Sequence, residues 1–273
     1  MKEATSMANS NAPTGDFIGI DIGGTGIKGG IVDLEKGDLK GSCIRLATPQ
    51  PANPNLVSEV VSQIMDELAA QSESLDCTST IGVTFPGIVQ HGISRSAANM
   101  DSSFINFDIN TLFTERLGRP TAVINDADAA GLAEARCGAG KQINGTVLVI
   151  TLGTGIGSAL IFDGQLVPNA ELGHLSIDGF DAEIKASAVA RERDGLSWKE
   201  YSVRLQRYFS ELEFIFSPEL IIVGGGISQK TDEYLPHLKL RTPIVPAKLK
   251  NEAGIVGAAM QAASTHQQLP ALT

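Results

Sequence analysis

The segment Asp21–Lys28, which reads DIGGTGIK, restricts the fold of this chain more than any other. An apolar run at 17–20 leads into it, and the run Gly29–Val32 leads out. Glycine adopts the positive φ angles that a tight turn needs, and without a side chain it leaves backbone amides open to an anion. The pattern therefore predicts two strands joined by a glycine turn whose N–H groups hold phosphate.

A second segment of the same kind occurs much later in the chain. Residues Thr151–Gly157 read TLGTGIG and follow the apolar run Val147–Ile150. A strand, a glycine turn and a returning strand would again present amides to a phosphate. Two such hairpins predict two related halves that face each other across a cleft.

The first hairpin also matches the dinucleotide-binding pattern GxGxxG through Gly24, Gly26 and Gly29. That pattern requires a helix after the turn and an acidic residue about 20 positions further on. Here β-branched Ile31 and Val32 follow, which favours a strand over a helix. No HRD or DFG sequence follows a kinase-type glycine loop, and no Walker A sequence is present. We therefore set the dinucleotide interpretation aside.

The composition limits the partners. The formal net charge of −10 argues against nucleic acid, whose phosphates need a basic face. Three cysteines without a CxxC pair argue against a disulfide framework or a zinc site, and a reducing cytoplasm is the simplest location. Residues 1–16 are polar, so we expect a disordered tail and no signal peptide. No apolar run approaches the ~20 residues of a membrane span, so we expect no membrane partner.

Apolar periodicity predicts alternating strands and helices, which defines the α/β class. Strands are expected at 17–20, 29–32, 41–47, 81–85, 122–124, 147–150, 158–162 and 220–223, and helices at 56–68, 109–117, 127–136, 198–216 and 252–263. Ser197 and Glu200 stand at the spacing of a capping box. We expect a small domain at 17–124, joined by the helix near 252–263, and a large domain at 125–251, with a hinge near Ile124.

Asn125 and Asp126 end a predicted strand, where open α/β sheets bind their ligands. One interpretation makes Asp126 the N-cap of the following helix. The other makes it the carboxylate that accepts a hydroxyl proton while a bond to phosphorus forms. Two phosphate hairpins in the same chain favour the catalytic interpretation, and the two roles are compatible.

Glu171 and His174 resemble half of a metal motif, but His91, His237 and His266 are scattered and complete no zinc site. A Glu and a His on one turn can instead hydrogen-bond vicinal hydroxyls of a sugar. Glu183 adds a further acceptor, although a solvated surface carboxylate is the favoured alternative for this residue alone.

Two further segments indicate a binding function only in combination with these motifs. Asn99 follows the turn Pro86–Gly87 and can reach the same sugar, or it is an ordinary turn residue. Gly224–Gly226 ends a predicted strand and lets a flat base or a phosphate chain approach. The alternative for these glycines is a plain turn between a strand and a helix.

Together these motifs resemble those of the ROK sugar kinases, a branch of the hexokinase–actin superfamily, from Phe17 to about Ala262. DIGGTGIK and TLGTGIG resemble the two phosphate motifs, ELGH resembles the sugar-binding ExGH motif, and IVGGGIS resembles the adenosine-side motif. The run Asn125–Glu134 is similar to that of the bacterial polyphosphate/ATP-dependent glucokinases and glucomannokinases.

The resemblance implies a two-domain actin-like ATPase fold with a central cleft. It also implies phosphoryl transfer from polyphosphate, ATP or both to the 6-hydroxyl of glucose and of mannose, with Mg²⁺, in a cytoplasmic homodimer. The sequence does not rank the two donors or the two sugars. A sugar-binding regulator that kept this fold and lost catalysis is the rival interpretation.

The resemblance also assigns roles to matching positions, with Asp126 as the general base. Hexose binding falls to Asn99, Asn125, Asp126, Glu171, His174 and Glu183. Phosphate binding falls to Asp21, Gly23, Gly24, Thr25, Gly26, Lys28, Thr151, Gly153, Thr154 and Gly155, and the nucleotide side to Gly224, Gly225 and Gly226. Asp21 would also place Mg²⁺ through water.

The chain departs from the family pattern in one respect. Many ROK proteins carry a cysteine-rich zinc site just after the ExGH histidine, whereas Leu175–Glu183 contains no cysteine, so we expect no structural zinc. Some ROK proteins are repressors with an N-terminal DNA-binding domain. The 16 residues before the first expected strand, with the net charge of −10, do not fit that role.

A long polyanionic donor would need a cationic track on an otherwise acidic protein. The basic side chains that qualify are Lys28, Lys185, Arg191, Arg193, Lys199, Arg204 and Arg207. For the set from Lys185 to Arg207, a solvated helix face with i, i+4 ion pairs is the favoured alternative.

Overall fold

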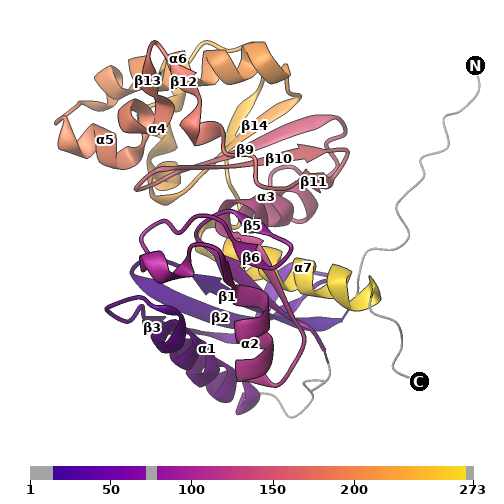
Figure 1. The fold of residues 1–273 in the computed structure, drawn as a ribbon. Coiled ribbons are helices and arrows are strands. Elements are labelled where there is room, and N and C mark those ends of the chain that lie inside the picture. Colours follow the sequence, from indigo (N-terminus) through magenta and orange to yellow (C-terminus); the bar gives the residue numbers. More distant parts are fainter. Residues whose placement is uncertain (1–14, 72–78, 269–273) are drawn as a thin grey trace, which may run out of the picture.

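The computed structural model describes residues 15–71 and 79–268, and each glycine turn lies in a five-stranded sheet (Figure 1). The first sheet has the order β3-β2-β1-β4-β8: β3 (Asp38–Ala47), β2 (Gly26–Asp33), β1 (Asp16–Ile22), β4 (Ile81–Phe85) and β8 (Thr121–Asn125). The second has the order β11-β10-β9-β14-β15: β11 (Gln165–Val167), β10 (Ile156–Phe162), β9 (Thr146–Leu152), β14 (Leu220–Gly224) and β15 (Ile244–Pro246).

The two sheets repeat one arrangement. In the first, β1 and β2 form an antiparallel hairpin with Asp21 opposite Lys28, and β4 lies parallel to β1. In the second, β9 and β10 form the hairpin, and β14 lies parallel to β9. A backbone hydrogen bond closes each turn, from Gly23 N–H to Gly26 O at 3.1 Å and from Gly153 N–H to Gly155 O at 3.0 Å. The expected α/β class, with two related glycine hairpins, is confirmed.

Helices α1 (Pro54–Ala69) and α2 (Ile109–Leu117) pack close to each other beside the first sheet. Asn53 caps α1 by accepting a hydrogen bond from Leu56 N–H at 3.0 Å, and Pro54 occupies the first helical position. A Cβ at Gly29 of β2 would lie 2.4 Å from Ile64 Cγ2. The absence of a side chain there lets the apolar face of α1 rest directly on the strand.

The last helix, α7 (Ala253–Gln268), packs on strands that are distant in sequence (Figure 1). A Cβ at Gly19 of β1 would lie 1.9 Å from Ile255 O, and one at Gly82 of β4 would lie 1.8 Å from Ala258 O. A Cβ at Gly257 would lie 1.9 Å from the backbone of α3 (Asp126–Arg136). Glycines therefore let α7 join the first sheet to α3. The helix also extends past its expected end at Ala263.

The second sheet carries α6 (Trp198–Phe216), α4 (Ala182–Ala186) and α5 (Ala188–Arg193). The expected capping box at the start of α6 is present between Ser197 and Glu200. The sequence did not predict α4 and α5, because helices this short show no periodicity.

Short elements connect the larger ones. The short strands are β5 (Val89–Gln90), β6 (Ile93–Ser94), β7 (Phe107–Asp108), β12 (Ser176–Ile177) and β13 (Phe180–Asp181). The described residues also form five 3₁₀ helices: η1 (Ser102–Phe104), η2 (Leu172–His174), η3 (Gly226–Glu233), η4 (Leu235–His237) and η5 (Lys250–Glu252).

The sequence predicted a disordered tail at 1–16, and this range extends too far toward the C-terminus, because Asp16 belongs to β1. Asp16 begins β1 opposite Asp33, and its carboxylate pairs with Lys40 Nζ at 2.7 Å. Residues 1–14 lie outside the described part of the chain. We propose that the small and large domains meet where β8 passes into α3, as the boundary 17–124 and 125–251 implies, with α7 returning to the small domain. Within 15–71 and 79–268, no helix combines the length and apolar character needed to cross a membrane.

Candidate active site

A cavity of about 640 Å³ lies between the two glycine hairpins. The predicted site residues that line it are Gly23, Gly24, Asn99, Asn125, Asp126, Thr151, Gly153, Thr154, Gly155, Glu171, His174, Glu183 and Gly225. Six others do not line it: Asp21, Thr25, Gly26, Lys28, Gly224 and Gly226. The structure thus gathers residues from both halves of the chain into one cleft.

The strand β8 ends at Asn125, and this residue, not Asp126, is the N-cap of α3. Asn125 Oδ1 accepts a hydrogen bond from Asp128 N–H at 2.9 Å, and its Nδ2 donates to Gly87 O at 3.1 Å. The interpretation of Asp126 as the helix cap is therefore wrong. Asp126 stands at the first helical position, where its Oδ1 accepts from Ala127 N–H at 2.9 Å.

The environment of Asp126 disfavours its charged form. Burial and, to a smaller extent, the nearby carboxylate of Asp21 raise the pKa of this carboxyl to about 7. A carboxyl with a pKa near neutrality exchanges its proton readily under physiological conditions. Asp126 therefore has the property that a general base needs.

Asp21 is held by two neighbours within the first sheet. Lys28 Nζ lies 3.1 Å from its Oδ2, and Thr84 Oγ1 donates to its Oδ1 at 2.9 Å. Thr84 also accepts a hydrogen bond from Ile22 N–H at 3.0 Å. The sequence analysis missed Thr84. Its signal was a single hydroxyl in the otherwise apolar strand β4.

His174 and Glu183 are joined by a residue that the sequence analysis did not select, Asp181. Asp181 Oδ2 pairs with His174 Nδ1 at 2.8 Å, and its Oδ1 accepts from Glu183 N–H at 3.1 Å as the N-cap of α4. Glu183 Oε2 in turn accepts from Ile156 N–H at 3.1 Å, beside the second glycine turn. Asp181 therefore ties the histidine to the helix that carries Glu183.

Two ionisable groups in this network have shifted pKa values. Burial raises the pKa of Glu171, and the hydrogen bond to Asp181 raises the pKa of His174. His174, Asp181 and Glu183 also bring potential metal ligands within 4.8 Å of one another. Since Asp181 already engages His174 Nδ1, the hydrogen-bonded network accounts for this arrangement. The absence of a structural zinc stays a prediction.

Glycine is required at two places around the cleft. A Cβ at Gly24 would lie 2.9 Å from Asn99 Cβ, so the first turn lies directly against Asn99, whose φ is +59°. Gly225 has a φ of +82°, and a Cβ there would lie 2.4 Å from Leu152 O beside the second turn. These close approaches place Asn99 and the end of β14 at the phosphate hairpins.

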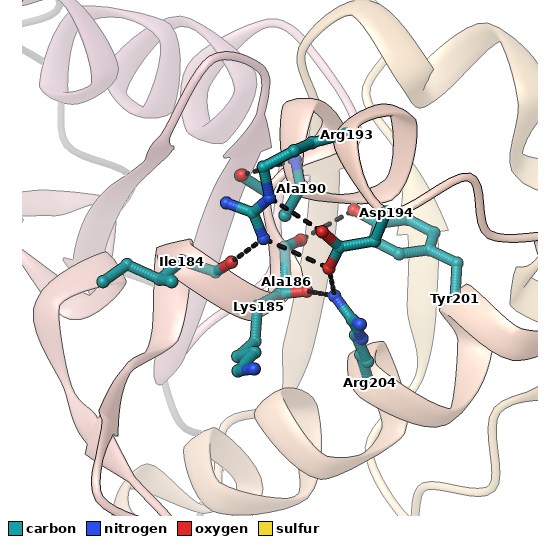
Figure 2. A network of polar contacts seen from close by, with 9 residues as sticks. Ile184, Lys185, Ala186, Ala190, Arg193, Asp194, Tyr201 and Arg204 are labelled. Atoms are coloured by element: carbon teal, nitrogen blue, oxygen red, sulfur yellow. Dashed lines mark hydrogen bonds and ion pairs between the residues drawn. The ribbon is translucent and has the colours of Figure 1, made fainter.

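Six of the seven basic side chains considered for a polyanion track have partners within the protein. Figure 2 shows Arg193 and Arg204 both reaching Asp194, at 2.8 and 2.6 Å. Arg207 pairs with Asp178 and Glu211, Arg191 lies over the Trp198 ring, Lys185 lies over the Phe180 ring, and Lys28 pairs with Asp21. A paired helix face describes the Arg and Lys set better than an open track does.

The fold and the cleft define a protein of the sugar-kinase class, and comparison with known proteins identifies the family. The ROK family pattern matches residues 17–190, and the chain belongs to the ROK family. The polyphosphate glucokinase of Mycobacterium tuberculosis (strain CDC 1551 / Oshkosh) is 46% identical over 243 residues, which cover 89% of each chain.

Solved structures agree with this assignment. The inorganic polyphosphate/ATP-glucomannokinase from Arthrobacter sp. strain KM is 70% identical with a TM-score of 0.88, covering 93% of this chain and 100% of that one. A ROK family glucokinase from Streptomyces griseus, in complex with glucose and AMPPNP, is 26% identical with a TM-score of 0.72 and the same coverage. The expected actin-like hexokinase fold is confirmed.

We expect Asp181→Asn to lower the pKa of His174 toward its ordinary value, because the amide carries no charge to stabilise the imidazolium. An NMR pH titration of the histidine ring protons, assigned with His174→Gln, measures this shift. Since folding raises this pKa, the stability that the pair contributes is present below the unfolded pKa of about 6.5 and is lost as pH rises through the folded value. The melting-temperature difference between wild type and variant should therefore shrink as pH rises.

Asp178→Asn serves as the control for this prediction, because Asp178 is an exposed carboxylate that pairs with Arg207 at 3.0 Å. Asp178→Asn should leave the pKa of His174 unchanged. An unchanged titration in Asp181→Asn would show that the pair does not set the histidine's pKa.

Proposed function

We propose that this chain is a hexose kinase that transfers a phosphoryl group from polyphosphate or ATP to the 6-hydroxyl of glucose, and also of mannose. The observation that carries the proposal is Asp126, a carboxyl of raised pKa that lines a cavity walled by both glycine turns. The 46% identity to a polyphosphate glucokinase and the 70% identity to a polyphosphate/ATP-glucomannokinase support the same activity.

Asp126 acts as the general base. Its carboxylate accepts the proton of the sugar 6-hydroxyl while the hydroxyl oxygen bonds to the transferred phosphorus and the donor's bridging bond breaks. The position at the start of α3 supports this role, because Asn125 caps the helix and leaves one Asp126 oxygen free of helix bonds. The helix N-terminus also favours the negative charge that the base carries before it takes the proton.

The hexose is held by side chains from four segments of the cleft. Glu171 and Glu183 accept hydrogen bonds from sugar hydroxyls. The ring nitrogen of His174 that Asp181 does not engage forms a further hydrogen bond to the sugar, as a donor when the imidazole is protonated. Asn99 and Asn125 line the same cavity and complete the set. Because Glu183 Oε2 is bonded to Ile156 N–H, its other oxygen is the one that faces the sugar.

The donor phosphates lie against the two glycine turns, and Mg²⁺ neutralises part of their charge when it is bound. The residues fit this ion. Magnesium in such sites takes one or two carboxylates together with phosphate oxygens and water. Each oxygen of Asp21 has one bond within the protein, to Lys28 or to Thr84, and a carboxylate offers about four lone-pair sites. Asp21 thus retains sites for water molecules of the ion.

Both donors present the same chemistry to the turns, since ATP and polyphosphate each end in a chain of phosphates. Gly224–Gly226 stands beside the second turn and takes the adenosine side when ATP is the donor. The acidic charge of the protein, −10, excludes nucleic acid as a partner. We also assign the enzyme to the cytoplasm.

The enzyme is a homodimer in this proposal. Helix α6 presents apolar side chains to solvent, with Val203 70% and Phe214 81% exposed. Exposed apolar surface of this kind on a soluble protein marks an interaction site. The resemblance to the ROK sugar kinases implies a second copy of the chain as the partner.

The proposed function is tested by following hexose 6-phosphate formation with glucose and with mannose, each with ATP and with polyphosphate. We expect turnover with both donors and its loss in excess chelator, because uncompensated phosphate charge opposes transfer. If ATP works and polyphosphate of every length fails, the donor assignment is wrong. Absence of turnover with all hexoses would favour the sugar-binding regulator instead.

We expect Asp126→Asn to lower kcat by about 10²–10⁴-fold, the usual contribution of general-base catalysis. The amide keeps the shape and still bonds the 6-hydroxyl, but it cannot take the proton. The loose transition state of phosphoryl transfer places the loss toward the lower end of that range. Glucose affinity, measured by calorimetry, should stay within a few fold. A variant with wild-type melting temperature and near-wild-type kcat would refute the assignment.

We expect kcat/KM to fall as pH decreases through about 7, because only the ionised form of Asp126 accepts a proton and burial raises its pKa to about 7. The pH dependence of kcat/KM for glucose measures this limb. Asp21→Asn removes the neighbouring negative charge and should move the midpoint to lower pH, whatever its effect on the maximal rate. A midpoint near 4 in the wild type would contradict this account.

A further inference from the structure

A second cavity, of about 530 Å³, lies at the junction of β8 and α3. Only Asn125 lines both this cavity and the cleft. Its walls come from both halves of the chain: β8, the β5–β6 turn, α2 and α7 on the side of the first sheet, and β11 and α3 on the other. The volume falls within the range of small-molecule sites, about 300–1,000 Å³.

One wall of this cavity contains a buried carboxylate with an unsatisfied oxygen. Asp128 is 1% exposed, and its Oδ2 accepts a hydrogen bond from Asn169 N–H at 2.7 Å. Its Oδ1 has no hydrogen-bond partner. A buried polar atom without a partner is destabilising, and more so when it is charged. A ligand that donates a hydrogen bond at this point would remove that penalty.

The same wall carries a positive charge. Asp128, Leu132 and Arg136 are spaced four residues apart on α3, so they share one face of the helix, and all three line the cavity. Arg136 is partly buried, and burial lowers the pKa of its guanidinium. Among the described residues, no carboxylate forms an ion pair with it. The Cα atoms of Asp128 and Arg136 are about 12 Å apart along the helix, with Leu132 between them on the same face.

The opposite charges leave between them a space with polar walls. The amide and hydroxyl side chains that complete the lining are Asn110, Gln165, Gln261, Ser264 and Thr265. We propose that this cavity binds a phosphorylated polyol of the size of a hexose phosphate, with its phosphate at Arg136 and its hydroxyls at Asp128. Naming hexose 6-phosphate as the occupant rests on the proposed function, of which it is the product.

This site is coupled to the cleft through the two halves that it touches. Asn169 Oδ1 accepts from Val89 N–H at 3.0 Å, and its Nδ2 donates to Val89 O at 3.0 Å, which fastens β5 to the segment beside Asp128. Asp126 and Asp128 share the first turn of α3. An occupant that bridges both walls resists the relative movement of the halves on which closure around a substrate depends. Hexose 6-phosphate bound here therefore inhibits without competing with the hexose.

The experiment measures binding of labelled glucose 6-phosphate by equilibrium dialysis to the full chain, with the cleft blocked by saturating glucose and a non-hydrolysable ATP analogue. We expect one bound equivalent in the wild type. Arg136→Gln should weaken it by about tenfold or more, since a charge-assisted bond is lost. Lys141→Gln, which removes an exposed charge outside the cavity, should leave it unchanged. Arg136→Lys, which keeps the charge, should restore part of the affinity if Arg136→Gln folds poorly.

Inorganic phosphate and sorbitol test the two ends of the site independently, since one carries only the phosphate and the other only the hydroxyls. Each should bind more weakly than glucose 6-phosphate, and Asp128→Asn should weaken the sugar phosphate and sorbitol but not phosphate. Equal binding of phosphate and sugar phosphate, or no binding beyond the cleft in the wild type, would overturn the proposal. Turnover measured on the same wild-type preparation keeps the two claims apart. An active enzyme without the second equivalent refutes this inference alone, and an inactive protein that binds it refutes the proposed function alone.

Discussion

The burial of one carboxylate, Asp126, at the junction of the two sheets is the constraint on which the rest of the structure depends. A carboxylate loses hydration when it is buried, and its pKa rises to about 7 as a result. Within 15–71 and 79–268, no basic side chain forms an ion pair with it. Instead Asn125 takes over the capping of α3, and Lys28 is engaged by Asp21. The carboxyl is thereby kept without an ion-pair partner and close to its proton-transfer midpoint.

The framework that keeps this arrangement rigid is built from close backbone contacts. Gly19 and Gly82 let α7 lie directly on β1 and β4, and Gly257 lets the same helix touch α3. Because protein interiors are packed as densely as organic crystals, any added methyl group at these glycines would displace the helix. The first turn of α3, which carries Asp126, is therefore fixed relative to the sheet that holds Asp21.

An acidic protein that binds polyphosphate or ATP must receive their charge without a large basic surface. The two glycine turns offer backbone amides, which are neutral donors, and the basic residues around α5 and α6 are already paired, as Arg193 and Arg204 are with Asp194. Neutral amides at the turns, with the basic side chains engaged elsewhere, suit the binding of a small terminal phosphate group better than the binding of a long polyanion along a basic track. It also explains why the chain can carry a net charge of −10 and still handle anions.

The sequence by itself determined the features that depend on neighbouring residues. The glycine turns, the capping box of Ser197 and Glu200, and the helix and strand periods follow from short-range geometry, and the motifs built on them carried the family resemblance. Several parts of the site depended on the tertiary structure, because their partners lie far apart in the chain. Thr84 reaches Asp21 across 63 positions and Asn169 reaches Asp128 across 41, so no local pattern records them. Asp181, seven residues from His174, needed the fold of the intervening hairpin to face it. The identity of the residue that caps α3 also depended on the tertiary structure. It follows from where β8 ends, and pairing with β4 sets that end.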